Sequence, residues 1–99
     1  MTEPLYIVAY DIADPRRWRR VYRLLQGYGE WVQLSLFQCR LDPMRRRLLE
    51  AELAQLIEPR LDRVLIARIA EAEKTGQIPR PITSLGPRFV PLRRVTLVL

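Results

Sequence analysis

Twice in this chain an aspartate is followed directly by a proline, at Asp14–Pro15 and at Asp42–Pro43. Each pair lies between an apolar, strand-like run and a segment with helical periodicity. An aspartate side chain caps the N-terminus of a helix, and a proline fits its first turn, where the missing N–H is not needed. The two pairs therefore predict two helices and divide the chain into alternating strand and helix segments.

Apolar residues recur at helical spacing after each pair. The first predicted helix covers about residues 15–27 and ends at two nearby glycines, and we expect its aromatic residues in the core. These aromatic residues are Trp18, Tyr22 and the adjacent Tyr28. The second predicted helix runs from Pro43 to Pro59. Its expected apolar side consists of Met44, Leu48, Leu49, Leu53, Leu56 and Ile57.

The remaining apolar segments have the composition of strands. Residues 5–12 form a continuous apolar run, which is typical of a central strand. Residues 31–41 alternate, with Val32, Leu34, Leu36 and Cys39 as the apolar positions, and predict either one long bent strand or two short ones. Further strands are expected at 62–70 and 95–99, separated by a connector that contains four prolines and two glycines.

This order of segments predicts a single domain with an α+β, ferredoxin-like sandwich, in which two helices cover one face of an antiparallel sheet. The expected core is about residues 1–70, the connector about 71–91, and the last strand about 92–99. A short apolar strand after a long connector is a poor independent unit, but it can extend the sheet of a second protomer. We therefore expect an intertwined homodimer with an exchanged C-terminal strand.

The composition excludes several kinds of catalytic site. The chain has no histidine and one cysteine, Cys39. Within one chain, a Ser/His/Asp triad, a Cys/His pair and a zinc site rich in these residues are therefore excluded, and any catalysis depends on carboxylates. The lone cysteine, the absence of a signal-like start and the lack of an apolar run of about 20 residues predict a cytoplasmic protein without a membrane partner.

Arginine is concentrated in one third of the chain. The net charge is +6, and residues 16–47 hold nine arginines against two acidic residues. In the first predicted helix, Arg16, Arg19, Arg20 and Arg23 form a stripe opposite the apolar side, and Arg17 joins Arg16 in the first turn. The helix dipole disfavours cations there by about 0.3–1 kcal/mol each. Arg45, Arg46 and Arg47 repeat this arrangement in the second helix, where Arg46 and Glu50 can form an i, i+4 pair.

This arginine pattern favours a polyphosphate partner, which means RNA or duplex DNA. Phosphate contacts do not require that bases be read, so binding should weaken steeply with salt. Sixteen of the seventeen basic residues are arginine, and a GC-rich genome would produce the same bias without any functional meaning. Both explanations remain open at the level of the sequence.

Asp11 is the candidate catalytic residue and metal ligand. It ends the first apolar run, on the same strand face as Ile7 and Ala9, and a buried carboxylate is costly unless it is paired or bound to a cation. It could cap the following turn or meet an arginine of the first helix. It could also hold Mg²⁺ or Mn²⁺, provided that Asp11 of a second copy, waters and phosphate oxygens complete the coordination.

Three segments together resemble a known family. These are YIVAYDIAD at Tyr6–Asp14, LLQGYG at Leu24–Gly29 and VQLSLFQCRL at Val32–Leu41, and the likeness extends over about residues 5–70. They resemble the small CRISPR-associated Cas2 family. The resemblance implies a ferredoxin-like homodimer that exchanges its last strand and works with the Cas1 integrase in spacer acquisition. It also implies metal-dependent endonuclease activity on single-stranded RNA or on duplex DNA, as described for some members.

The resemblance also implies roles for individual residues. The aspartate that is central to the family matches Asp11, and Ser35 and Phe37 match residues at its site, with Tyr10 beside Asp11 as a further candidate for the site lining. Two positions depart from the family pattern. Gln38 stands where a glutamate is common, and Trp31 where a basic residue is common.

Three functions follow as hypotheses. The first is a nuclease in which two Asp11 carboxylates hold the metal and the arginines of the first helix hold the phosphodiester. The second is a non-catalytic scaffold that grips duplex DNA for the integrase. The third is an RNA-recognition or ribosomal-protein module on the same sandwich, although the aromatic stacking motif of RNA-recognition domains is absent.

Overall fold

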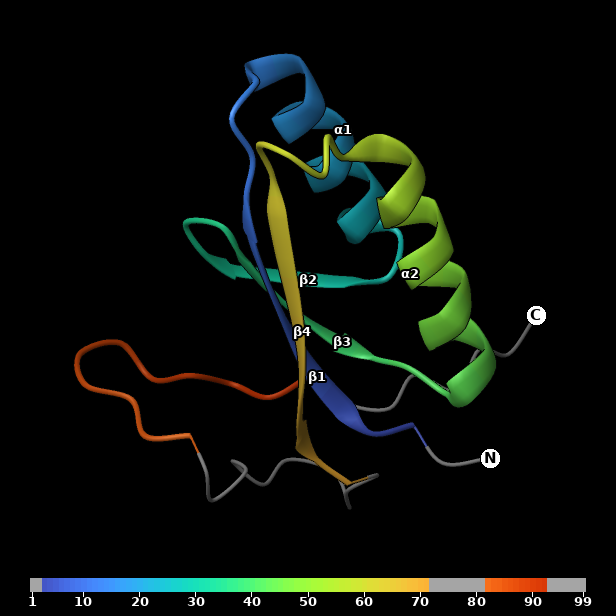
Figure 1. The fold of residues 1–99 in the computed structure, drawn as a ribbon. Helices are drawn as coiled ribbons and strands as arrows, with labels where there is room; N and C mark the ends of the chain where they lie inside the picture. Colours follow the sequence, from blue (N-terminus) through green and yellow to red (C-terminus); the bar gives the residue numbers. More distant parts are fainter. Residues whose placement is uncertain (1–2, 72–81, 93–99) are drawn as a thin grey trace.

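The computed structural model describes residues 3–71 and 82–92, and it consists of a sheet covered on one side by two helices (Figure 1). Its elements alternate in the order expected for a ferredoxin-like chain. The strands are β1 (Leu5–Asp11), β2 (Gly29–Gln33), β3 (Leu36–Arg40) and β4 (Arg63–Ala70), and the helices are α1 (Pro15–Gln26) and α2 (Pro43–Leu56).

The four strands form one antiparallel sheet in the order β2-β3-β1-β4. The central strand β1 pairs with β3 on one side and with β4 on the other, and β2 pairs with β3. The sequential strands β2 and β3 thus form a hairpin, whereas α2 connects β3 to β4, which lies beyond β1 and pairs with it. The fold is the α+β, ferredoxin-like sandwich that the sequence predicts.

Both helices begin at their aspartate–proline pairs. The Asp14 side chain accepts hydrogen bonds from the backbone N–H groups of Arg16 and Arg17, and these contacts lower the pKa of its carboxyl group. The Asp42 side chain accepts one from the backbone N–H of Arg45 at 2.8 Å. These bonds satisfy N–H groups that the first helical turn leaves without partners, which explains why the two positions are so clear in the sequence.

The main core lies between the helices and the sheet. Its fully buried members from the sheet include Val8 of β1 and Phe37 of β3, and those from the helices include Leu25 and Leu49. The aromatic residues of α1 pack against this core, as expected. Trp18 stacks on Tyr22 with ring centroids 5.3 Å apart, and Tyr22 contacts the edge of Phe37 at 5.4 Å.

The structure resolves residues 31–41 as two short strands, and it corrects the predicted pattern of buried residues. Leu34 is 81% exposed and lies in the turn between β2 and β3, with φ at +41°. Because the turn interrupts the alternation, Phe37 and Cys39 point into the core, and Leu36 lies on the other side of the sheet. Burial raises the pKa of the Cys39 thiol to about 12, so this cysteine is an inert core residue.

The predicted apolar side of α2 is wrong at two positions. Met44 and Leu48 are exposed, whereas Leu49 and Leu53 are buried. Each exposed residue precedes a buried one by five positions, which places the two about 140° apart around the helix axis. Only the part of α2 that faces the sheet is therefore buried, and this part is narrower than the run of apolar residues suggests.

The described part of the connector lies against the other side of the sheet. Its residues 82–92 are irregular, as expected, and residues 90 and 92 are held by β3. The Gln38 amide donates to the Val90 carbonyl oxygen at 2.8 Å and accepts from the Leu92 N–H at 2.6 Å, and Arg40 donates to the Leu92 carbonyl oxygen. Residues 72–81 and the exchange strand expected after Leu92 lie outside the described residues.

Candidate functional site

Asp11 lies at the end of β1, and its side chain is exposed. It follows the buried Tyr10, and strand alternation directs it away from the helices, to the same side as Ile7 and Ala9. Within residues 3–71 and 82–92, its side chain forms no hydrogen bond or ion pair. The expectation of a buried carboxylate is thus wrong for the single chain, because the helices cover only the other side of the sheet.

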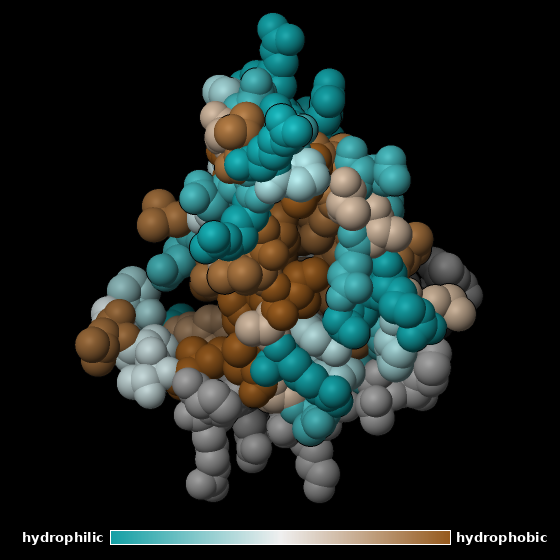
Figure 2. Space-filling model, in the orientation of Figure 1, coloured by the Kyte–Doolittle hydropathy of each residue, from teal (hydrophilic) through white to brown (hydrophobic). Residues whose placement is uncertain are grey.

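We call the side of the sheet that the helices do not cover the open face. Besides Asp11, it includes Ile7, Ala9, Leu36 and Leu65, as the strand register shows. Leu65 is 57% exposed. Figure 2 shows apolar surface gathered over the sheet in the middle of the molecule, with hydrophilic side chains around it. An apolar surface of this kind, which ends in an exposed carboxylate, favours contact with another molecule.

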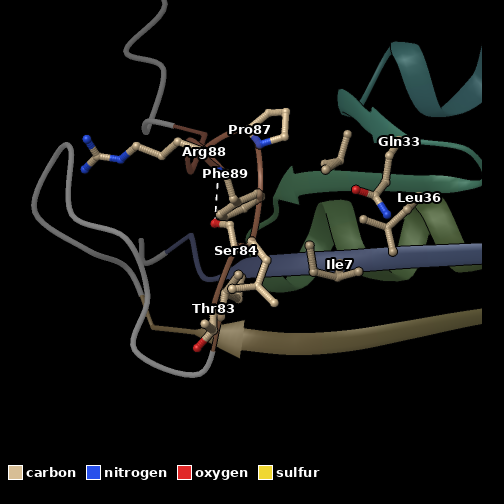
Figure 3. Close-up of a pocket in the computed structure, with 11 residues that line it drawn as sticks. Ile7, Gln33, Leu36, Thr83, Ser84, Pro87, Arg88 and Phe89 are labelled. Carbon is tan, nitrogen blue, oxygen red and sulfur yellow. Dashed lines mark hydrogen bonds between the residues drawn. The ribbon is translucent and has the colours of Figure 1, made fainter.

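Part of the open face is covered by the connector. A cavity of about 570 Å³ lies between the sheet residues Ile7 and Leu36 and the connector residues 82–89 (Figure 3). The Ser84 hydroxyl accepts a hydrogen bond from the backbone N–H of Phe89 at 3.0 Å, which closes the connector into a loop. The cavity lining is mostly apolar, and Asp11 is not part of it.

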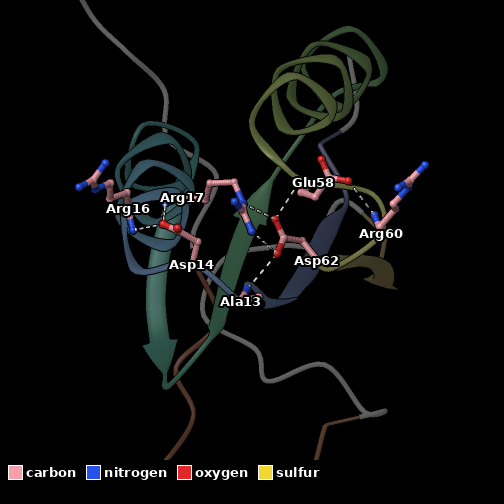
Figure 4. A network of polar contacts seen from close by, with 7 residues as sticks. All are labelled: Ala13, Asp14, Arg16, Arg17, Glu58, Arg60 and Asp62. Carbon is pink, nitrogen blue, oxygen red and sulfur yellow. Dashed lines mark hydrogen bonds and ion pairs between the residues drawn. The ribbon is translucent and has the colours of Figure 1, made fainter.

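Asp62, and not Asp11, caps the turn after β1 and pairs with an arginine of α1. Its carboxylate accepts hydrogen bonds from the backbone N–H groups of Ala13 at 2.9 Å and Glu58 at 2.8 Å (Figure 4). It also accepts two from the Arg17 guanidinium, at 2.8 and 3.2 Å. The structural role considered for Asp11, as a cap of the turn or a partner of an arginine, is therefore filled by Asp62. The signal for Asp62 was an acidic residue directly before an apolar strand, which the sequence analysis did not single out.

The Asp62–Arg17 pair links the loop after β1 to the loop before β4. The hydrogen bonds from Arg17 hold the pKa of the Asp62 carboxyl group well below its usual range, and Asp62 in turn raises the pKa of Arg17. The Asp62 side chain is fully buried. Arg17 is therefore engaged within the fold, which sets it apart from the other arginines of α1.

Arg16, Arg19, Arg20 and Arg23 form the exposed side of α1, as the spacing predicts. We call these four residues the arginine stripe. In α2, Arg46 forms the expected ion pair with Glu50, and Arg45 lies over the Tyr28 ring at 5.2 Å. Arg47 is exposed. Of the two arginine-rich helix starts, α1 thus presents the larger continuous cationic surface.

Of the other predicted site residues, Tyr10 and Phe37 lie on the opposite side of the sheet from the Asp11 side chain. Tyr10 and Phe37 are buried on the helix side of the sheet, 6.2 Å apart between ring centroids, so they do not line the open face. Burial raises the pKa of Tyr10, and its hydroxyl has no hydrogen-bond partner in the described residues. The Ser35 carbonyl oxygen accepts from the Tyr10 N–H at 3.0 Å, which places Ser35 next to the end of β1.

The described residues do not form a metal site within one chain. They contain no group of three or more histidine, cysteine, aspartate or glutamate side chains suited to a metal. Asp11 offers one exposed carboxylate, and a hard cation such as Mg²⁺ takes about six oxygen ligands. The donor chemistry therefore fits a divalent cation only if another molecule supplies further oxygens.

Together these features define a class: small ferredoxin-like proteins with an exposed carboxylate at the end of the central strand and an arginine-rich helix that follows this strand. The family described as CRISPR associated protein Cas2 matches residues 4–75. This chain therefore belongs to the Cas2 family, and its role is CRISPR-associated. In residues 3–71 and 82–92, no helix is long and apolar enough to span a membrane.

Relatives from several bacteria match most of the chain. CRISPR-associated endoribonuclease Cas2 1 of Rhodospirillum rubrum is 45% identical, and the match covers 98% of this chain and 92% of the relative. CRISPR-associated endoribonuclease Cas2 of Geobacter sulfurreducens is 40% identical, with coverage of 98% and 99%. A Thermus thermophilus relative that is 39% identical bears the name CRISPR-associated endonuclease Cas2 2, and the match covers 82% of this chain and 91% of that one.

Solved structures support the same assignment. A crystal structure of a hypothetical protein from Thermus thermophilus is 36% identical, with a TM-score of 0.72 over 90% of this chain and 98% of that one. The crystal structure of Streptococcus pyogenes Cas2 at pH 6.5 is 25% identical, with a TM-score of 0.65 over 83% and 99%.

Proposed function

We propose that this chain is a metal-dependent endonuclease that cuts RNA or duplex DNA as a homodimer. The observation that carries this proposal is Asp11, an exposed carboxylate at the end of the central strand that has no side-chain partner within residues 3–71 and 82–92. The endoribonuclease and endonuclease names of the relatives support a phosphodiesterase reaction. Since the chain lacks histidine and its cysteine is buried, a carboxylate is the available catalytic group.

The homodimer is needed because one chain supplies too few ligands. We propose that the open faces of two copies meet and bring both Asp11 carboxylates to one Mg²⁺ or Mn²⁺ ion. When bound, such a cation would activate a water and offset charge on the phosphodiester. The contribution of the chain itself is to present the carboxylates and to hold the phosphates with the arginine stripe. An apolar open face with Leu65 more than half exposed supports this pairing.

The Asp11→Asn variant tests the catalytic proposal. Asparagine has the same shape but is a weaker ligand for a hard cation, so cleavage should fall at least about 100-fold while nucleic-acid binding persists. The measurement is cleavage of RNA and of duplex DNA by pure protein, with and without Mg²⁺. Glu30→Gln is the matched control, because it neutralises another exposed strand carboxylate. Cleavage by Asp11→Asn at the wild-type rate would place the reaction elsewhere.

A second candidate function is a non-catalytic scaffold that grips duplex DNA for the Cas1 integrase during spacer acquisition in the cytoplasm. It is favoured by the arginine stripe, which is exposed on one helix and needs no metal to bind phosphates. Both functions are compatible with one homodimer.

Charge reversal on α1 tests the scaffold. Changing Arg16, Arg19 and Arg20 to glutamate should abolish duplex binding at physiological salt. At low salt, where residual binding can be measured, the slope of log K against log salt should be smaller, because each lost phosphate contact lowers that slope by about one. In this case Asp11→Ala should not affect spacer integration in a reconstituted reaction with the integrase. Unchanged duplex binding by the triple variant would exclude α1 as the DNA-binding surface.

A further inference from the structure

Trp31 is an exposed aromatic residue that the core does not explain. It lies in the edge strand β2, directly before the turn, and is 53% exposed. Its indole N–H donates a hydrogen bond to the Leu34 carbonyl oxygen at 2.8 Å. This bond satisfies the only polar group of the ring and holds it against its own turn, which extends beyond the sheet in Figure 1. The ring is therefore oriented before any partner binds.

The strand register places Trp31 on the helix side of the sheet. Trp31 is the cross-strand partner of Phe37, and such partners point to the same face. Phe37 contacts the Tyr22 ring of α1 at 5.4 Å. Trp31 thus follows Tyr22 and Phe37 in a row of aromatic residues that runs from α1 to the edge of the sheet.

The same edge of the sheet faces part of the arginine stripe. Arg17 is directed to Asp62 and hence towards β4, at the opposite edge of the sheet from β2. Arg19 is two positions further along α1, which places it about 200° around the helix axis from Arg17. It therefore projects towards the β2 edge. Arg19, with Arg23 one turn later, lies on the same flank of the molecule as Trp31.

We propose that Trp31 is a stacking platform for an unpaired base of single-stranded nucleic acid whose phosphates are bound by Arg19 and Arg23. This inference rests on the proposed function and assigns to Trp31 a role in selecting single strands for that site. A flat aromatic ring beside cationic side chains is how proteins bind single strands without reading sequence, because every base has a π-face. The stacked bases of a duplex do not offer that face. Pre-orientation of the ring by Leu34 limits the entropy lost on binding.

The first test compares the binding of Trp31 variants to a short oligouridylate and to a long blunt duplex in metal-free buffer. Trp31→Ala should raise the Kd for the single strand about 10-fold or more, because stacking of one base contributes about 1–3 kcal/mol. The Kd for the duplex and the salt slope should not change, since the indole carries no charge. Trp31→Phe should recover most of the affinity. Leu48→Ala is the matched control, because Leu48 is apolar and also 53% exposed.

A second test detects stacking without disturbing Trp31. Trp18→Phe leaves Trp31 as the only tryptophan, and oligouridylate should then quench its fluorescence with the same Kd as that measured for binding. The stacking role would be overturned if oligouridylate did not quench this fluorescence. It would also be overturned if Trp31→Ala bound the single strand as tightly as the wild type while Arg19→Glu bound it more weakly. Either result would leave the proposed function intact. An equal loss of duplex binding in Trp31→Ala would overturn the preference for single strands. Failure of the wild type to bind either nucleic acid would reject both proposals.

Discussion

Two aspartates with the same chemistry serve different purposes because their surroundings differ. Asp11 is exposed on the open face and has no partner in the described residues, so its carboxylate is available to a ligand. Asp62 is buried and accepts four hydrogen bonds from Ala13, Arg17 and Glu58. The buried aspartate holds the loop that follows Asp11. At the scale of single residues, structural and functional roles are thus divided between the two carboxylates.

Asp62 should make the stability of the protein depend on pH. Its pKa in the folded state lies below the ordinary value of 3.8, so it contributes stability that is fully present above that value. The free energy of unfolding should therefore fall as the pH drops below about 5, and Asp62→Asn should reduce both the stability at pH 7 and this dependence. Urea denaturation between pH 3 and 7 provides the measurement. Equal pH dependence in the variant and the wild type would contradict this account.

Side chains of β3 hold the connector against the sheet. On the open face, β3 presents the side chains of Gln38 and Arg40. These side chains form hydrogen bonds with the backbone groups of residues 90 and 92, which in a regular strand would bond to the backbone of a neighbouring strand. Arg40 also donates to the carbonyl oxygens of Glu3 and Glu71. Both side chains are buried under the connector. They determine where the chain leaves the sheet before its last residues.

Gln38→Glu should loosen the attachment of the connector. A carboxylate can still accept from the Leu92 N–H, but it cannot donate to the Val90 carbonyl oxygen and is repelled by it. We expect a loss of about 1–3 kcal/mol in the free energy of unfolding and faster amide exchange at Leu92. Gln33→Glu is the control, because Gln33 is exposed and should tolerate the charge. Unchanged exchange at Leu92 would show that the Gln38 contacts do not hold the connector.

The whole molecule has two sides with different properties. The helix side encloses the main core and carries the arginine stripe on its outer surface. The open face combines apolar side chains with the Asp11 carboxylate. If two copies pair through their open faces, their arginine stripes lie on the outside of the dimer, where they can reach a nucleic acid.

Leu65→Asp tests this pairing of whole molecules. Leu65 is 57% exposed in the single chain, and its burial between two open faces would place a charge in an apolar interface. The variant should be monomeric, should retain its fold and should lose cleavage, as measured by light scattering, circular dichroism and nuclease assays. Leu48→Asp introduces the same charge at a similarly exposed position of α2 and should leave the oligomeric state unchanged. A dimeric Leu65→Asp variant would exclude this interface.

The local features of the fold could be predicted from the sequence, because they depend on residues close together in the chain. Asp14 and Asp42 cap helices through N–H groups two or three residues away. Strand and helix periodicity gave the element order, and the arginine stripe follows from spacing within one helix. The same periodicity wrongly predicted that Leu34 and Leu48 are buried. Leu34 lies in the turn between β2 and β3, and Leu48 lies outside the narrow part of α2 that faces the sheet.

The arrangement of the site was decided by contacts between distant parts of the chain. Asp62 meets Arg17 across 45 positions, and Gln38 meets Val90 across 52. The exposure of Asp11 depends on which side of the sheet the helices cover, and strand alternation defines two sides without saying which one is covered. Periodicity therefore specified the elements, and only their packing determined which carboxylate is buried in the fold and which is free to bind a ligand.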